Sequence, residues 1–295
     1  MLRRGRFRLS RAFTQPRTKQ VPPNRLFSCG SSQSKAAAVI VTSTSFALFS
    51  FAKVSAKSRA SAMSDETSLE STLQNADQLF DENHFQEVCD VLNKFQDCSL
   101  AEIKWRKARA LYSQSKTIKN NEEKSKIIRE SYQLISEALE ANANDYCIHK
   151  WMAIILDANA ELDGIKSRVS HLETVKKHMI RAVELNPMDP TSWYLLGQFE
   201  YSLADMPWIQ RKIVSTIFAT PPTGTYDRAL EYFEKAEGIK EGFYSMNWLM
   251  LGKCYLVLQD KESAKTFLEK AANCHTLNED DKICKEEATK LLKKL

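Results

Sequence analysis

Residues 246–268 read MNWLMLGKCYLVLQDKESAKTFL, and this stretch decides the fold. Large and small residues recur along it at helical spacing, in the order Trp248, Leu251, Gly252, Tyr255, Ala264 and Leu268. We expect the two small residues, Gly252 and Ala264, where two antiparallel helices approach most closely. The large residues then fill the space around that contact. The stretch therefore predicts a helical pair that packs large side chains against small ones.

The same pattern recurs upstream. Trp193 and Gly197 open a second unit, and Ala229 and Phe233 close it. Recurrence of Trp-x2-Leu-Gly followed by Ala-x3-Phe or Leu is typical of tetratricopeptide repeats. The predicted fold is therefore an all-α, tetratricopeptide-like solenoid, a class of fold that holds partners more often than it transforms substrates. Its expected repeat-packing residues are Trp193, Gly197, Ala229, Phe233, Trp248, Gly252, Tyr255 and Ala264.

Helical periodicity divides residues 68–295 into five pairs and a final helix. The pairs are expected at residues 68–98, 101–141, 145–186, 190–241 and 244–276. In the second pair, we expect the loop between the two helices to be longer than a standard repeat allows. The last helix, from Glu279, has apolar residues on one side and charges elsewhere, as a capping helix of a solenoid does.

The fourth pair is interrupted between Tyr201 and Tyr226. Pro207 suits the first turn of an added helix, and isoleucines at positions 209, 213 and 217 line one side of it. Because large apolar side chains on helices are usually buried, we expect this helix to fill the concave groove of the solenoid and to add to the core. The alternative is a contact with a partner or with lipid, with Trp208, Arg211, Lys212 and Phe218 as the contact residues.

The net charge of +5 conceals a strong asymmetry along the chain. Residues 1–64 contain twelve Lys or Arg and no Asp or Glu, which leaves 37 acidic residues against 30 basic ones in the remainder. The body is mildly acidic, so binding of nucleic acid through a basic field is not expected.

The N-terminal region divides into three segments before the helical domain at 68–295. Residues 1–35 are Arg-rich, Ser-rich and free of acid, which is typical of a mitochondrial transit peptide; a disordered basic tail is the alternative. Residues 36–52 are seventeen uncharged residues, and a helix of that length rises about 25 Å against a hydrocarbon core of ~30 Å. They are a marginal membrane anchor, part of a sorting signal or a continuation of the leader. Residues 53–67 are expected to be a polar linker.

Catalytic and metal-binding patterns are not found in the sequence. The seven cysteines form no C-x-x-C pair, so buried free thiols are expected, with an oxidised Cys274–Cys284 pair as the alternative. His171 and His178 lie seven residues apart on one expected helix without a third ligand. Neither a Gly-rich phosphate loop nor a Gly-x-Ser-x-Gly elbow occurs. We therefore expect a protein without catalytic activity, cofactor or metal.

Three segments together resemble the regulator of microtubule dynamics family. They are His149–Trp151, Ala182–Pro190 and the interruption Met206–Pro222 with its continuation Tyr226–Leu230. The likeness covers about residues 68–292. It implies an all-helical protein that associates with microtubules and spindle poles. Family members also occur at mitochondria, and one relative tethers endoplasmic reticulum to mitochondria and binds phospholipid through its repeats.

One basic cluster is a candidate contact for the acidic tails of tubulin. Its members are Lys104, Arg106, Lys107, Arg109, Lys124, Lys126 and Arg129. The alternative is a solvated helical face whose charges pair with neighbouring repeats.

Two functional hypotheses follow. The first is a non-enzymatic scaffold that associates with microtubules and holds a peptide or protein in its concave groove. The second is a membrane-anchored module that binds phospholipid or tethers organelles. The leader argues for the mitochondrion, and the resemblance argues for the cytoplasm, spindle microtubules and spindle poles. The sequence leaves both locations open.

Overall fold

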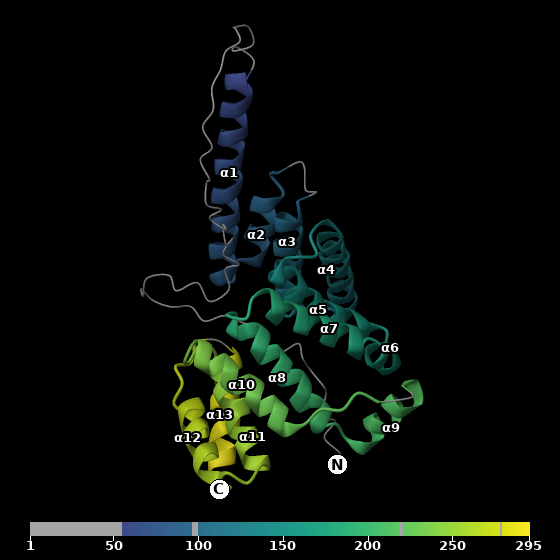
Figure 1. The fold of residues 1–295 in the computed structure, drawn as a ribbon, viewed down its shortest axis with the longest axis vertical. Coiled ribbons are helices and arrows are strands. Elements are labelled where there is room, and N and C mark those ends of the chain that lie inside the picture. Colours follow the sequence, from purple (N-terminus) through teal and green to yellow (C-terminus); the bar gives the residue numbers. More distant parts are fainter. Residues whose placement is uncertain (1–54, 96–99, 219–220, 278) are drawn as a thin grey trace, which may run out of the picture.

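The computed structural model describes residues 55–95, 100–218, 221–277 and 279–295, with side chains from Ser68 onward, and these residues form helices and turns without strands. The expected leader and the apolar segment at 36–52 lie outside the described residues. The helices are α1 (Ser55–Asp81), α2 (Phe85–Leu92), α3 (Ala101–Ser115), α4 (Asn121–Ala141), α5 (Tyr146–Leu162), α6 (Ile165–Ser170), α7 (Leu172–Leu185), α8 (Pro190–Ala204), α9 (Trp208–Ile217), α10 (Tyr226–Ile239), α11 (Ser245–Val257), α12 (Lys261–Ala272) and α13 (Glu279–Leu292) (Figure 1).

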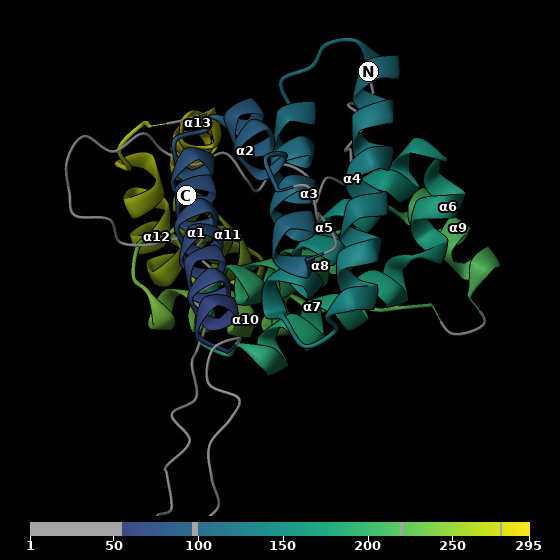
Figure 2. The same ribbon diagram turned by 90° about the horizontal axis from the view of Figure 1, so that it is seen from above.

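The helices pack as successive pairs: α1 with α2, α3 with α4, α5 with α7, α8 with α10, and α11 with α12. Helix α13 packs on α11 and α12, which confirms the predicted capping helix. Seen from two directions, the pairs follow one another along the molecule as a solenoid (Figures 1 and 2). The predicted tetratricopeptide-like fold with an interrupted fourth repeat is therefore confirmed.

Two expectations about connecting segments are wrong. Helix α1 begins at Ser55, inside the predicted linker at 53–67. That segment contains no Gly or Pro to stop a helix that continues to Asp81. The long loop expected in the second pair is also absent, because residues 116–120 alone separate α3 from α4. The extra length is in α4, which has 21 residues and begins where the Asn120 side chain accepts hydrogen bonds from the backbone N–H groups of Glu122 and Glu123.

The third pair contains a short helix that was not predicted from the sequence. After α5, Gly164 adopts φ +93°, a left-handed conformation that a residue with a Cβ rarely adopts. The chain then forms the six-residue helix α6 before α7 begins at Leu172. Helix α9 interrupts the fourth pair in the same way. The two inserted helices, α6 and α9, pack against each other at one edge of the solenoid (Figures 1 and 2).

The predicted contact of small against large residues holds the two helices of a repeat together. A Cβ on Gly197 would lie 2.6 Å from Cε1 of Phe233, and a Cβ on Gly252 would lie 2.7 Å from Cδ2 of Leu268. Both facing side chains are fully buried. The residue opposite Gly252 is therefore Leu268, whereas Ala264, also fully buried, adds to the same interface.

The aromatic repeat residues Trp193, Trp248 and Tyr255 pack at the rim of the core and not at its centre around the glycines. Trp193 donates through Nε1 to the carbonyl of Pro187 at 2.8 Å. Trp248 donates through Nε1 to Glu237 at 2.6 Å. Tyr255 stacks on Phe267 with ring centroids 5.7 Å apart. These three side chains are half-buried, so each joins an apolar contact to a polar one.

The replacement Gly252→Ala tests the close approach of α11 to α12. Its methyl group has no space beside the fully buried Leu268, so we expect the variant to lose ~1–3 kcal/mol of unfolding free energy. The matched control is Gly238→Ala in α10, where a Cβ meets no atom within 4 Å. That variant should gain about 0.5–1 kcal/mol, because alanine loses less entropy than glycine in a helix. Urea unfolding measures both, and equal effects at the two glycines would contradict the packing described.

Candidate functional site

The members of the basic cluster do not share one surface, because two of its arginines are buried. Arg106 donates to both carboxylate oxygens of Asp77 in α1 at 2.9 Å, and it also pairs with Glu102. Arg109 pairs with the same Asp77 carboxylate, and its guanidinium lies 4.1 Å from the ring centroid of Phe80. The prediction that Arg106 and Arg109 contact tubulin is therefore wrong. The sequence shows their charge, but it does not show that α1 places a carboxylate against α3.

Two other members of the cluster are engaged at the surface. The ammonium group of Lys104 lies 3.0 Å from the Glu137 carboxylate, and this pair lowers the pKa of Glu137. Arg129 lies 2.7 Å from Asp163, with both side chains about half exposed. Exposed pairs of this kind contribute little to stability and exchange readily with solvent. Lys104 and Arg129 can therefore reach a partner only by leaving their present carboxylates.

The remaining cluster members are Lys107, Lys124 and Lys126. Among the residues that the structure describes, none of the three takes part in an ion pair. Lys126 is exposed on the first turns of α4, whereas Lys107 and Lys124 are half-buried. We refer to these three as the α3–α4 lysines. They are the part of the predicted cluster that a partner can reach directly.

The inserted helix α9 does not fill the groove as expected. Trp208 is 72% exposed and Ile209 is 58% exposed, although Val214 on the same helix is buried. Helices α8 and α10 pair directly with each other, which leaves α9 at the edge beside α6. The expectation that Trp208 and its neighbours add to the core is therefore wrong, whereas Phe218, just after the helix, does pack against the core.

The two basic residues of α9 have different roles. Arg211 donates through Nη2 to the carbonyl of Met206 at 2.9 Å and to that of Ala204 at 3.3 Å. A cation is stabilised there because the carbonyl end of a helix carries partial negative charge. Arg211 thus fastens α9 to the end of α8. Lys212 is exposed, and no ion pair joins it to another described residue.

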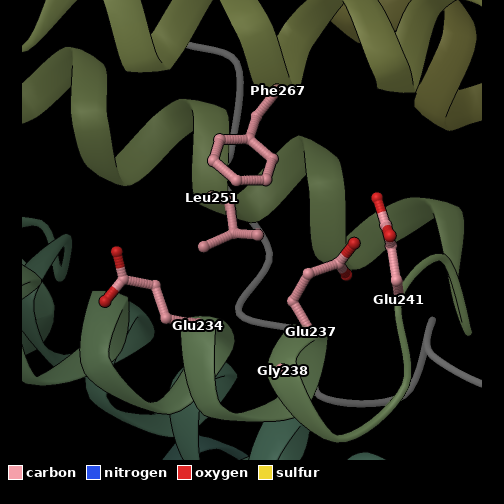
Figure 3. A pocket seen from close by; sticks show the side chains of 6 residues that line it. All are labelled: Glu234, Glu237, Gly238, Glu241, Leu251 and Phe267. Carbon is pink, nitrogen blue, oxygen red and sulfur yellow. The ribbon is translucent and has the colours of Figure 1, made fainter.

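A shallow pocket of about 470 Å³ lies where α10, α11 and α12 meet (Figure 3). It is lined by Glu234, Glu237, Gly238, Glu241, Leu251 and Phe267. Its carboxylates bind residues of the protein itself. Glu237 accepts hydrogen bonds from Trp248 and Asn247, Glu234 accepts one from Tyr255, and Glu241 pairs with Lys270 at 2.9 Å.

These pairings give the pocket a structural role, since its carboxylates join α10 to the next repeat. The only sequence signal for this pocket is the recurrence of glutamates at 234, 237 and 241 at helical spacing, and it does not predict a pocket by itself.

The cysteines of the described residues are mostly inert. Cys89, Cys254, Cys274 and Cys284 are buried free thiols, as predicted, and burial raises the pKa of Cys254 and Cys284 to about 12. A thiol that remains protonated is a poor nucleophile. Cys147 is the exception to the prediction, because it is disulfide-bonded.

His178 pairs with His149 of α5 and not with His171. Nδ1 of His149 lies 2.9 Å from Nδ1 of His178, and Nε2 of His149 lies 3.0 Å from the Ala143 carbonyl. A carbonyl only accepts, so Nε2 of His149 carries its proton and Nδ1 of His178 donates to Nδ1 of His149. Burial and the neighbouring imidazole lower the pKa of His178 to about 4. In the described residues, no cluster of three or more potential ligands surrounds this pair.

This pair makes stability depend on pH. An unfolded histidine has a pKa of about 6.5, so as the pH falls toward about 4 the unfolded state binds protons that the folded state excludes. The free energy of unfolding should therefore decrease across this range. His178→Asn keeps a donor for His149 but does not titrate, and its urea midpoint should fall less between about pH 7 and about pH 5 than that of the unaltered chain. All other titrating groups, including Asp145, are present in both proteins, so their contributions to the pH dependence cancel in the comparison. Equal decreases of the urea midpoint in the two proteins would contradict the assignment of this pH dependence to His178.

None of the described helices is long and apolar enough to cross a membrane.

A family model described as Regulator of microtubule dynamics protein 1-3 matches residues 72–295. The chain belongs to the regulator of microtubule dynamics family. It is 37% identical over 236 residues to Regulator of microtubule dynamics protein 1 of Pongo abelii, covering 80% of this chain and 75% of that protein. It is 30% identical over 233 residues to protein 2 of Bos taurus, covering 77% of this chain and 56% of that protein. This family member is thus more similar to the first of these two relatives.

A solved structure supports the fold of this family member. The chain matches a thermophilic TPR protein of Thermus thermophilus with a TM-score of 0.53 and 11% sequence identity. The match covers 75% of this chain and 98% of that protein. At this identity the likeness establishes the tetratricopeptide-like fold alone.

Proposed function

We propose that this family member is a non-enzymatic interaction scaffold that associates with microtubules through the α3–α4 lysines. The observation that carries the proposal is that Lys107, Lys124 and Lys126 lie outside the ion pairs that engage the rest of the basic cluster. Membership of a family named for regulating microtubule dynamics supports microtubules as the partner. The buried pair of arginines supports the same surface indirectly, because it holds α3 in place against α1.

The attraction is electrostatic and therefore weak and sensitive to salt. Tubulin's exposed tails are acidic, and a group of lysines attracts them over roughly one Debye length, about 8 Å at physiological ionic strength. Exposed carboxylates of Glu122, Glu123 and Glu130 lie on the same helix as two of the lysines and reduce the local field. We therefore expect binding at low salt that fades as the ionic strength rises.

A second partner surface belongs to the same proposal. Repeat solenoids use the concave face formed by successive helical pairs to hold extended peptides or proteins. We infer a peptide or protein ligand for that face, in addition to the microtubule. Both contacts require the solenoid to face the cytoplasm, where it can reach microtubules of the interphase array or spindle. Import into mitochondria through the leader would separate the solenoid from microtubules.

Charge reversal of the α3–α4 lysines tests the proposal. The variant Lys107→Glu, Lys124→Glu, Lys126→Glu should bind microtubules at least about tenfold more weakly in co-sedimentation at low salt, because attraction to an acidic tail becomes repulsion. Of the three changes, Lys124→Glu lies at the end of the first turn of α4, where an acidic residue is favourable. Retained helical circular dichroism would show that the variant folds.

The matched control reverses three exposed lysines on the last two helices, Lys261, Lys265 and Lys285. It changes the net charge equally, so it should bind nearly as the unaltered chain does. Equal binding by the unaltered chain and the α3–α4 variant would refute the assignment. Replacing Arg106 is unsuitable for this test, since it would remove one of the two arginines that pair with Asp77 and would weaken the contact between α1 and α3.

A further inference from the structure

Ser215 lies in a sequence context that no other serine or threonine of residues 68–295 shares. It alone has a lysine or arginine three residues before it, Lys212, and Arg211 precedes that lysine. Residues 206–226 contain no Asp or Glu that would weaken the charge of this basic pair. Basophilic protein kinases select serines by such upstream charges, because carboxylates in the kinase's substrate groove bind them. The segment therefore has the charge pattern of a basophilic kinase substrate.

The structure places this serine where an enzyme can reach it. The side chains of Arg211, Lys212 and Ser215 are all exposed on α9, which lies at the edge of the solenoid (Figures 1 and 2). Oγ of Ser215 donates a hydrogen bond to the carbonyl of Lys212 at 2.8 Å. This hydrogen bond lies within one turn of α9, so access to the hydroxyl requires no change in another helix.

Helix α9 can open locally with little loss of packing. It has ten residues, of which seven are exposed and one, Val214, is buried. Pro207 precedes the helix, and Pro221 and Pro222 follow it, so it cannot extend in either direction. A helix shorter than about 12–15 residues is marginal unless packing supports it. Because α8 pairs directly with α10, α9 can become the extended chain that a kinase binds while the helical pairs stay folded.

Arg211 makes the contact that a phosphate on Ser215 would change. Its Nη2 donates to the carbonyls of Met206 at 2.9 Å and Ala204 at 3.3 Å. Residues four apart are neighbours on a helix surface, and helical side chains lean toward the N-terminus, so a phosphate on Ser215 points toward Arg211. Phosphoserine carries a charge of about −1.5 to −2 and three acceptor oxygens. It therefore binds a guanidinium more strongly than two neutral carbonyls do.

We propose that a basophilic protein kinase phosphorylates Ser215 and that the phosphate releases α9 from the end of α8. Oγ of Ser215 attacks the γ-phosphorus of ATP, the new O–P bond forms as the bond to ADP breaks, and the hydroxyl proton passes to a base of the kinase. The phosphate then draws Arg211 away from the carbonyls of α8. Its charge also lies in the last turn of α9, where the helix dipole opposes a negative group. This regulation goes beyond the proposed association with microtubules and does not depend on it.

Treatment of the full chain with ATP and the catalytic domain of protein kinase C tests the site. We expect mass spectrometry that resolves individual sites to find phosphate on Ser215. Lys212→Ala removes the charge three residues before the serine and should lower the rate at least about tenfold, the contribution of one charge-assisted contact. Lys212 is exposed, so this variant keeps the fold. The matched control Thr216→Ala removes the adjacent exposed hydroxyl and should leave the rate unchanged.

The chain contains an internal standard for this reaction. Thr14 and Ser28 each have an arginine three residues before them. A basic peptide substrate confirms that the kinase is active. Absence of phosphate from Ser215 under these conditions would overturn the assigned site, most directly if Thr14 or Ser28 is modified. Casein kinase 2 selects serines that precede acidic residues, so equal modification of Ser215 by both kinases would overturn the role of the basic pair.

Hydrogen–deuterium exchange of the phosphorylated and unmodified full chain tests the release of α9. Peptides that cover residues 206–218 should exchange at least about threefold faster after phosphorylation, because a negative charge at a helix C-terminus alone costs about that factor. Peptides that cover α12, Lys261–Ala272, should not change. Arg211→Ala lacks the contact with α8, so its residues 206–218 should exchange rapidly before modification, and the phosphate should add little.

Two results of this measurement would overturn the proposed release. Equal exchange at residues 206–218 with and without the phosphate would show that α9 stays in place. Acceleration in Arg211→Ala as large as in the unaltered chain would show that the phosphate does not act through Arg211. None of these variants changes an α3–α4 lysine, so either result leaves the test of microtubule binding unaffected.

Discussion

The contact of a glycine with a large side chain on the facing helix is the constraint on which the solenoid depends. Gly197 against Phe233 and Gly252 against Leu268 bring two helix backbones closer than any other residue would allow. Close pairing of α8 with α10 leaves no space between them for the segment that joins them. The chain must therefore pass outside the pair, and α9 is formed there. The exposure of Trp208 is thus a consequence of packing elsewhere.

Buried ion pairs determine which basic residues of α3 remain at the surface. Asp77 on α1 draws Arg106 and Arg109 inward, so the first repeat is joined to the second by ion pairs as well as apolar contacts. The guanidinium of Arg109 also lies over the rings of Phe80 and Trp105, which stabilises a cation away from water. Removing one partner from such a group is costly, at about 3–5 kcal/mol, because the other charge stays buried. The surface that remains for a partner is smaller and less basic than the composition of α3 and α4 suggests.

The fold could be predicted from the sequence because its signals are local. Each of these signals is contained within a few neighbouring residues. They are the helical spacing, the two Leu-Gly pairs and turn residues such as Asn83, which has φ +64°. The candidate surfaces could not be predicted as well, because burial depends on distant segments. Arg106 is paired 29 residues away, and His149 meets His178 across the same separation. Neither contact can be inferred from the spacing of neighbouring residues. Helix α6 is too short to show a helical periodicity in the sequence.

If microtubules contact the start of α4, the inserted helices remain free when the protein is bound to them. Hydrogen–deuterium exchange of the full chain, with and without polymerised tubulin, distinguishes these two surfaces in one experiment. We predict slower exchange in peptides that cover residues 116–130 and unchanged exchange at residues 206–218. Protection of 206–218 with none at 116–130 would contradict the proposed function, because α9 would then be the microtubule contact.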